Sequence, residues 1–170
     1  MLGTKLVRLI ERHSEALSRG LTKVICTSDR TSDFREIPGD DLRLAAADVY
    51  HQLGEWLLQK TEDDIAQRFR SLGARRASQQ IRLPQLVWAL TLSRDYLWRF
   101  LHREALDDSI VQLHAELELQ DLLNHFFDRA IYYAIVGYEE RQRSTADDWT
   151  RAKAWAVSVG LMPPSEGRAS

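Results

Sequence analysis

Apolar residues recur at intervals of three and four positions along most of this chain, a spacing typical of α-helices that bury one face. The pattern predicts helices over residues 4–25, 41–60, 61–77, 84–101 and 107–138, and a short final helix between 144 and 160. Residues 27–40 are rich in Ser, Thr, Asp, Pro and Gly, which predicts a loop anchored by Phe34 and Ile37. No segment alternates with the period of two that a strand requires. The expected fold class is all-α, a single-domain bundle of about six helices.

The helix expected from residue 107 onwards would be about 50 Å long at about 1.5 Å per residue. Because few globular helices are that long, we expect a kink or break between Glu116 and Gln120. Asp107 or Asp108 would cap the start of this helix, and Ser144 would cap the separate final helix.

The run from residue 72 to 101 joins a polar junction to the most apolar helix, and the rest of the chain is expected to pack around it. Gln79 and Gln80 lie in the connection, and Pro84 opens the helix where a missing N–H costs little. This helix carries two apolar flanks, so we expect burial on more than one side. The second flank has a residue at every fourth position and is the predicted interface with another protein: Trp88, Leu92 and Tyr96.

Length and composition predict one domain over residues 1–160, followed by a flexible tail over 161–170. The net charge of −2 offers no field that would attract nucleic acid. No apolar run approaches the roughly 20 residues of a membrane span. The single cysteine, Cys26, and the lack of a leader-like start favour the cytoplasm.

Five histidines are the first candidates for holding a metal or haem: His13, His51, His102, His114 and His125. None lies three or four residues from another with a carboxylate placed to complete a ligand set, so we expect neither a metal site nor a cofactor. His13 lies in the apolar stripe of its helix and could face a pocket, although a core histidine bonded to a backbone carbonyl is the more ordinary role. The chain has no Gly-rich phosphate loop, GxSxG or HExxH, and we expect no enzymatic activity.

Basic residues gather around the polar junction: Arg68, Arg70, Arg75, Arg76 and Arg82. They could hold an anionic ligand or an acidic partner, but a solvated face with salt bridges to Glu62, Asp63 or Asp95 is the favoured interpretation. The candidate ligand-binding residues are His13, Arg75, Arg76 and Trp98.

Eight positions carry a resemblance to a known family: Gly73, Arg76, Ala77, Leu83, Leu86, Leu90, Arg94 and Trp98. Their order resembles the N-terminal input domains of RsbT co-antagonist proteins of the RsbRD type, and the likeness covers roughly residues 5 to 142. The family usually has Gly in the bend where this chain has Gln80. The resemblance implies a helical sensory module, with a globin-like fold as one alternative, that commonly precedes output domains in bacterial regulators and kinases.

We therefore expect a non-catalytic cytoplasmic sensor or scaffold that forms a homodimer through its helices and contacts a signalling partner. The alternative is a haem- or small-ligand-binding globin-like protein, with a pocket near His13, His102 or His125. An enzyme that uses an unrecognised cofactor is a weaker third option. A compact final helix with a polar tail would favour a regulator that acts alone over a chain that continues into an effector.

Overall fold

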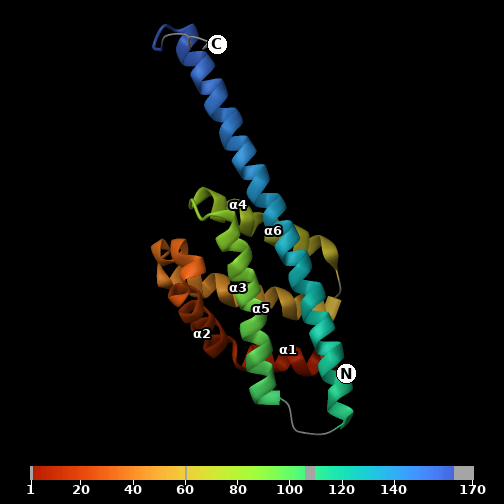
Figure 1. Ribbon diagram of the computed structural model, residues 1–170. Helices are drawn as coiled ribbons and strands as arrows, with labels where there is room; N and C mark the ends of the chain where they lie inside the picture. The colour runs from red at the N-terminus through yellow and green to blue at the C-terminus, as the bar shows by residue number, and fades with distance from the viewer. Residues whose placement is uncertain (1, 60, 106–109, 163–170) are drawn as a thin grey trace, which may run out of the picture.

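The computed structural model describes residues 2–59, 61–105 and 110–162, and within these ranges the regular elements are all helices. The expectation of an all-α bundle is confirmed (Figure 1). In chain order the elements are α1 (Leu2–Arg12), α2 (Ser14–Thr27), the 3₁₀ segment η1 (Asp29–Glu36), α3 (Gly39–Gln59), α4 (Glu62–Ser78), α5 (Leu83–Ala105) and α6 (Ile110–Ser158).

The core lies where α6 packs along α4 and α5, and where α3 packs against α1 and α2. One face of each helix supplies it, as the apolar spacing predicts. The largest fully buried side chains come from five of the helices and, for Ile81, from the bend between α4 and α5: Leu17, Leu21, Tyr50, Leu53, Ile65, Phe69, Ile81, Leu86, Leu97, Leu101, Phe126 and Phe127. A single core therefore joins the described helices.

The helix expected over residues 4–25 is bent at His13, which has φ −112° and ψ 14° and separates α1 from α2. Backbone hydrogen bonds continue across the bend, from His13 N to Leu9 O and from Leu17 N to His13 O. The His13 ring packs edge-on against Phe100 at 5.3 Å between ring centroids. The bend lets α1 lie on α3 while α2 also reaches η1 and α5, so the single-helix prediction was wrong at this residue.

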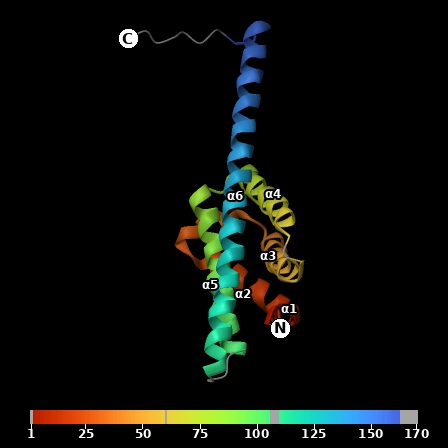
Figure 2. The same ribbon diagram turned by 90° about the vertical axis from the view of Figure 1, so that its right-hand side faces the viewer.

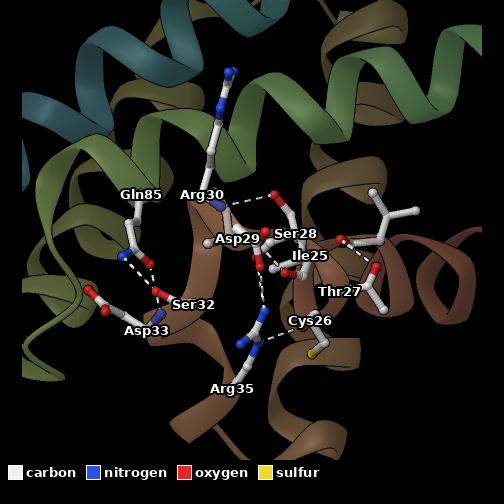
Figure 3. Close-up of polar contacts among 12 residues, drawn as sticks. Ile25, Cys26, Thr27, Ser28, Asp29, Arg30, Ser32, Asp33, Arg35 and Gln85 are labelled. Atoms are coloured by element: carbon white, nitrogen blue, oxygen red, sulfur yellow. Dashed lines mark hydrogen bonds and ion pairs between the residues drawn. The ribbon is translucent and has the colours of Figure 1, made fainter.

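Residues 29–36, expected as loop, form the 3₁₀ segment η1, and polar contacts fix it (Figure 3). The Asp33 N–H donates to Gln85 Oε1 at 2.7 Å, and Gln85 Nε2 donates to Ser32 Oγ at 3.2 Å. Arg35 Nε donates to the Cys26 carbonyl at 2.9 Å. The expected anchors of this segment, Phe34 and Ile37, are buried. The segment is therefore attached to both α2 and α5.

The bend between α4 and α5 is a Schellman motif. The Ile81 N–H bonds to the Arg76 carbonyl at 3.1 Å, and the Gln80 N–H bonds to the Ala77 carbonyl at 3.0 Å. Gln80 has φ 61°, the left-handed conformation that glycine adopts most easily. The Tyr138 hydroxyl donates to the Ile81 carbonyl at 2.8 Å, which ties the bend to α6. A glycine at position 80 would therefore adopt the backbone conformation of this bend without strain.

Replacing Gln80 with glycine should stabilise the protein by roughly 0.5–1 kcal/mol. The left-handed conformation strains an L-residue by about 1–2 kcal/mol, which glycine would avoid. Glycine loses more backbone entropy on folding, and this offsets about half of the stabilisation. Thermal or urea unfolding checks the sign. Gln67→Gly, at an exposed interior position of α4, is the matched control and should destabilise by about 1 kcal/mol. A lower melting temperature for Gln80→Gly than for the parent protein would contradict this account.

The chain from residue 110 to 158 forms one continuous helix of 49 residues, about 74 Å at 1.5 Å per residue. Neither the break expected between Glu116 and Gln120 nor the separate final helix is present. The Thr145 hydroxyl donates to the Arg141 carbonyl at 3.0 Å within the helix, and the chain from 138 to 158 contains no Gly or Pro to interrupt it. The expected caps Asp107 and Asp108, and the expected tail from 163 onwards, lie outside the described residues.

The last buried residues of α6 are Gly137 and Tyr138, and residues 139–155 are all exposed. This part of the helix extends well beyond the bundle in both views (Figures 1 and 2). We call residues 139–158 the C-terminal arm. A compact final helix was the reason to expect a regulator that acts alone. The structure has no such compact helix, so this reason no longer holds.

Candidate functional site

A groove of about 560 Å³ lies between α3 and α4. Each helix lines it with residues spaced four, three and four apart, which places them on one helical face. From α3 these residues are Asp41, Ala45, Asp48 and Gln52. From α4 and the residue that follows it they are Arg68, Leu72, Arg75 and Gln79, with Arg76 beside them. The α4 wall is thus basic and the α3 wall acidic. We call this feature the α3–α4 groove.

Arg76 is the unusual residue of this groove, because its side chain is buried at 3% exposure. Its Nη1 donates to Gln79 Oε1 at 2.6 Å, and its guanidinium lies 5.6 Å from the centre of the Phe34 ring. Its Nε is buried and has no hydrogen-bond partner among the described residues. Burial, and then the charge of Arg75, lower the pKa of Arg76 to about 10, against the opposing effect of Asp41. A buried cation with an unsatisfied donor is costly in a native structure.

The five predicted basic residues do not form one site. Arg82 pairs with Asp33 at 2.8 Å, and its hydrogen bonds lower the pKa of that carboxyl to about 2. Arg70 lies 6.0 Å from the centre of the Tyr133 ring. The remaining three, Arg68, Arg75 and Arg76, line the α3–α4 groove.

The salt bridges expected for this basic group are not formed within the described part of the chain. Glu62 pairs instead with Arg129 at 3.4 Å, and Asp95 with Arg94 at 3.5 Å. Among the described residues, none of the three groove arginines has a carboxylate within ion-pair distance. Their charge is therefore available to a ligand.

The other two candidate ligand residues lie away from the groove. His13 is half-buried against Phe100 and borders an open depression formed by α1 and α2. Trp98 is half-buried on α5, with its ring 5.3 Å from that of His102. The structure thus brings together Arg75 and Arg76 but adds neither His13 nor Trp98 to them.

No described histidine lines the α3–α4 groove. The rings of His125 and Trp56 are 5.8 Å apart, and His51 pairs with Glu55 at 3.4 Å. The side chain of His114 is outside the described set. In the described ranges no cluster of three or more His, Cys, Asp or Glu side chains is suited to a metal ion.

The predicted interface flank of α5 is half-buried against its own chain. The Arg30 guanidinium lies 4.5 Å from the centre of the Trp88 ring. The Tyr96 hydroxyl sits on Gly20, where an added Cβ would lie 2.6 Å from the Tyr96 Cζ atom. The surface that this flank offers to another protein is confined to the remaining edges of Trp88, Leu92 and Tyr96, and it stays a predicted interface.

Sequence reasoning missed the α3 wall of the groove, because Asp41 at a helix start is explained by capping and dipole effects alone. The four–three–four spacing of Asp41, Ala45, Asp48 and Gln52 was the available signal.

Sequence reasoning also missed the C-terminal arm, where the Trp149 side chain is 65% and the Trp155 side chain 62% exposed. Exposed tryptophans on a helix surface are typical of a contact surface.

The arm carries a heptad pattern, in which residues three and four apart alternate along one stripe. From Gln142 the stripe contains Thr145, Trp149, Ala152 and Ala156. Asp148 and Lys153 lie on either side of it. Such a stripe can pair with another helix.

None of the described helices is long and apolar enough to cross a membrane. No curated protein and no solved structure matches this chain. A family model does match, over residues 8–152, and its description is the RsbT co-antagonist protein rsbRD N-terminal domain. Members of this family are regulatory input domains of signal transduction. Because the match spans most of the 170 residues, the chain belongs to the RsbT co-antagonist protein rsbRD N-terminal domain family.

Proposed function

We propose that this chain is a non-catalytic signalling domain that forms a homodimer through the C-terminal arm and conveys the state of its bundle to a partner protein along α6. The observation that carries the proposal is the arm itself, a solvent-exposed extension of a core helix with two exposed tryptophans. A helix of that kind gains most by burying its apolar stripe against a second helix. Family membership in signal transduction supports the regulatory part.

The charges beside the stripe favour a parallel pair of arms. In a parallel coiled coil, charged residues that flank the core positions pair between the two helices. The residue just before a core position on one helix lies opposite the residue four positions after the same core position on the other helix. Around Trp149 these flanking residues are Asp148 and Lys153. They carry opposite charges, so two favourable pairs would form in a symmetric dimer. The predicted flank of Trp88, Leu92 and Tyr96 would serve as a second contact for a signalling partner.

Sedimentation equilibrium of the parent protein at micromolar concentration should give a dimer. Ala152→Glu places like charges at the centre of the stripe and should raise the dissociation constant at least tenfold, equivalent to about 1.4 kcal/mol. Ala154→Glu is the matched control, because it adds the same charge on the opposite side of the arm. A monomeric parent protein, or equal effects of the two variants, would refute dimerisation through the arm.

A charge exchange tests the direction of the pair. Asp148→Lys and Lys153→Asp should each weaken the dimer, and the double variant should restore it if the arms are parallel. In an antiparallel pair these two residues do not face each other, so the double variant would not recover. Circular dichroism at 222 nm confirms that each variant keeps its helices.

Ligand binding is the second candidate function, and the α3–α4 groove favours it. Haem is the less suitable ligand for that groove, because no described histidine lines it. An absorption spectrum after haem addition is the direct test, and a Soret band lost on His13→Ala would revive the haem alternative.

A further inference from the structure

We propose that the α3–α4 groove is a binding site for a small oxyanion, a carboxylate or phosphoryl group held by Arg75 and Arg76 with Arg68 at its edge. The groove volume of about 560 Å³ is in the range of small-molecule sites. Its basic wall comes from α4, so Arg68, Arg75 and Arg76 border the groove together without any loop rearrangement. This site rests on the geometry of the groove and not on dimerisation.

The buried state of Arg76 is the strongest argument. Burying a cation is tolerated when it is paired or fully hydrogen-bonded, and Arg76 has neither condition met: Gln79 satisfies Nη1, while Nε lacks a partner among the described residues. An oxyanion can accept two parallel N–H bonds from a guanidinium. A bound anion would therefore supply the missing charge and accept the unused donors after a small adjustment of the side chain.

A purely structural role for Arg76 would require a counter-ion from the protein. Asp41 raises the pKa of Arg76 through its charge, yet it lies beyond ion-pair distance of the Arg76 guanidinium. Asp48 accepts a hydrogen bond from Gln52 at 3.4 Å. The acids of the α3 wall are thus near the arginine but do not neutralise it by direct contact.

The acidic α3 wall narrows the ligand class. A bare polyanion would be repelled by Asp41 and Asp48, whereas a molecule with an oxyanion at one end and an amino or hydroxyl group at the other would be complementary to both walls. The groove therefore suits a small amino- or hydroxy-substituted acid or phosphate ester. Phosphoethanolamine and β-alanine are probes with this charge pattern, and inorganic phosphate and acetate lack the second group.

The site is placed to influence α6. Three residues before Arg76, Gly73 packs against the backbone of α6, and an added Cβ there would lie 2.8 Å from the Ala134 carbonyl carbon. With backbones this close, a ligand that shifts α4 would also shift α6. This coupling step, unlike the binding step, depends on the proposed function.

Titration calorimetry of the full chain with the four probes tests the site. We expect phosphoethanolamine or β-alanine to bind with a dissociation constant below about 1 mM, and more tightly than inorganic phosphate or acetate. Tighter binding of phosphoethanolamine than of β-alanine assigns a phosphoryl group to the ligand, and the reverse order assigns a carboxylate. No heat from any probe at about 10 mM, or equal affinity for the simple anions and the substituted ones, would overturn the proposed ligand class.

Variants locate the site. Arg75→Gln leaves an exposed position neutral and should weaken binding at least fivefold, and Arg76→Gln should abolish it. Arg143→Gln, an exposed arginine on the arm that pairs with Glu139, is the control and should bind as the parent does. Arg76→Gln changes a buried residue and could unfold the bundle. The decisive variants are therefore Arg75→Gln and Asp48→Asn. Unchanged probe affinity in both variants would refute the site.

The monomeric variant separates the two proposals. Ala152→Glu should still bind the probe, since the arm lies outside the groove. If Ala152→Glu is monomeric and still binds the probe, the groove site does not depend on dimerisation. If Arg75→Gln is dimeric and no longer binds the probe, the site is supported independently of the dimer.

Discussion

Replacing Gly137 with alanine is expected to destabilise the protein by about 3 kcal/mol or more. An added Cβ at this position would overlap the Arg70 carbonyl oxygen and lie 2.6 Å from the carbonyl carbon. Those atoms belong to the backbone of α4, which cannot rotate away as a flexible side chain can. Overpacking in a rigid core typically costs about 1–3 kcal/mol, and more when the backbone must move. Chemical unfolding followed by circular dichroism measures the loss.

Gly54→Ala is the control for this substitution. It is also an interior helix position, but its added Cβ would lie 3.8 Å from the Val7 Cγ1 atom, an ordinary contact. Helix propensity then dominates and favours alanine by about 1 kcal/mol. The two substitutions should therefore have opposite signs, and a stabilising Gly137→Ala would show that α4 and α6 are not in close backbone contact.

The same close approach has a consequence for signalling. Gly73 and Gly137 lie on facing surfaces of α4 and α6, and packed backbones transmit small displacements because interiors have little free volume. A change at the α3–α4 groove can therefore reach the arm through rigid helices. Gly73→Ala should disturb the same crossing, and its added Cβ would lie 2.9 Å from the Tyr138 amide nitrogen.

The helices themselves could be predicted from sequence because the apolar spacing is strong. Residues 83–105 illustrate this, since Leu86, Leu90 and Leu97 are buried as their spacing predicts. The family could be recognised from residues 73–98, where the pattern of Gly, Arg and Leu reflects the α4–α5 bend and its packing. Local pattern and tertiary structure agree at these positions.

The positions that could not be predicted depend on contacts distant in the chain. The first helix bends at His13, whose ring packs against Phe100 of the distant helix α5. Gly137 has no signature other than being glycine, which weakens a helix when judged locally. The sequence predicts a separate short helix in the arm because Ser144 and Asp147 have the spacing of a helix cap. The preceding turn is not broken, so these residues do not cap a new helix.

The candidate site could be predicted only in part. Arg75 and Arg76 were recognisable as a basic pair, and the structure brings them together in the α3–α4 groove. Asp41 and Asp48 were not recognisable as its opposite wall, because helix pairing is decided by tertiary packing. Burial of Arg76 was equally inaccessible, since a run of charged residues ordinarily predicts a solvated face.

Phe126→Ala is expected to cost about 3–5 kcal/mol, the range for removing a fully buried phenylalanine. The Phe126 side chain is completely buried, and its ring centroid lies 5.8 Å from Trp56, 5.7 Å from Phe69 and 5.2 Å from Phe127. These rings come from α3, α4 and α6, so one substitution opens a cavity at the junction of three helices. The edge-to-face pairs with Phe69 and Phe127, about 0.5–1.5 kcal/mol each, place the loss in the upper part of that range.

Leu117→Ala is the control, because Leu117 lies on the same helix at 55% exposure and alanine is a good helix former. It should change stability by less than about 0.5 kcal/mol. Equal stability of the two variants would contradict the packing role of Phe126.

The fate of the arm in Phe126→Ala follows from the same energetics. An isolated helix of about 20 residues is marginal in water, and residues 139–155 are exposed along their whole length. The arm therefore depends on the folded bundle below it, or on a second arm beside it. Combined with Ala152→Glu, Phe126→Ala should lose the helical signal of the arm and of the bundle in one transition, because neither support remains. A residual helical signal equivalent to the arm would show instead that residues 139–158 are stable on their own.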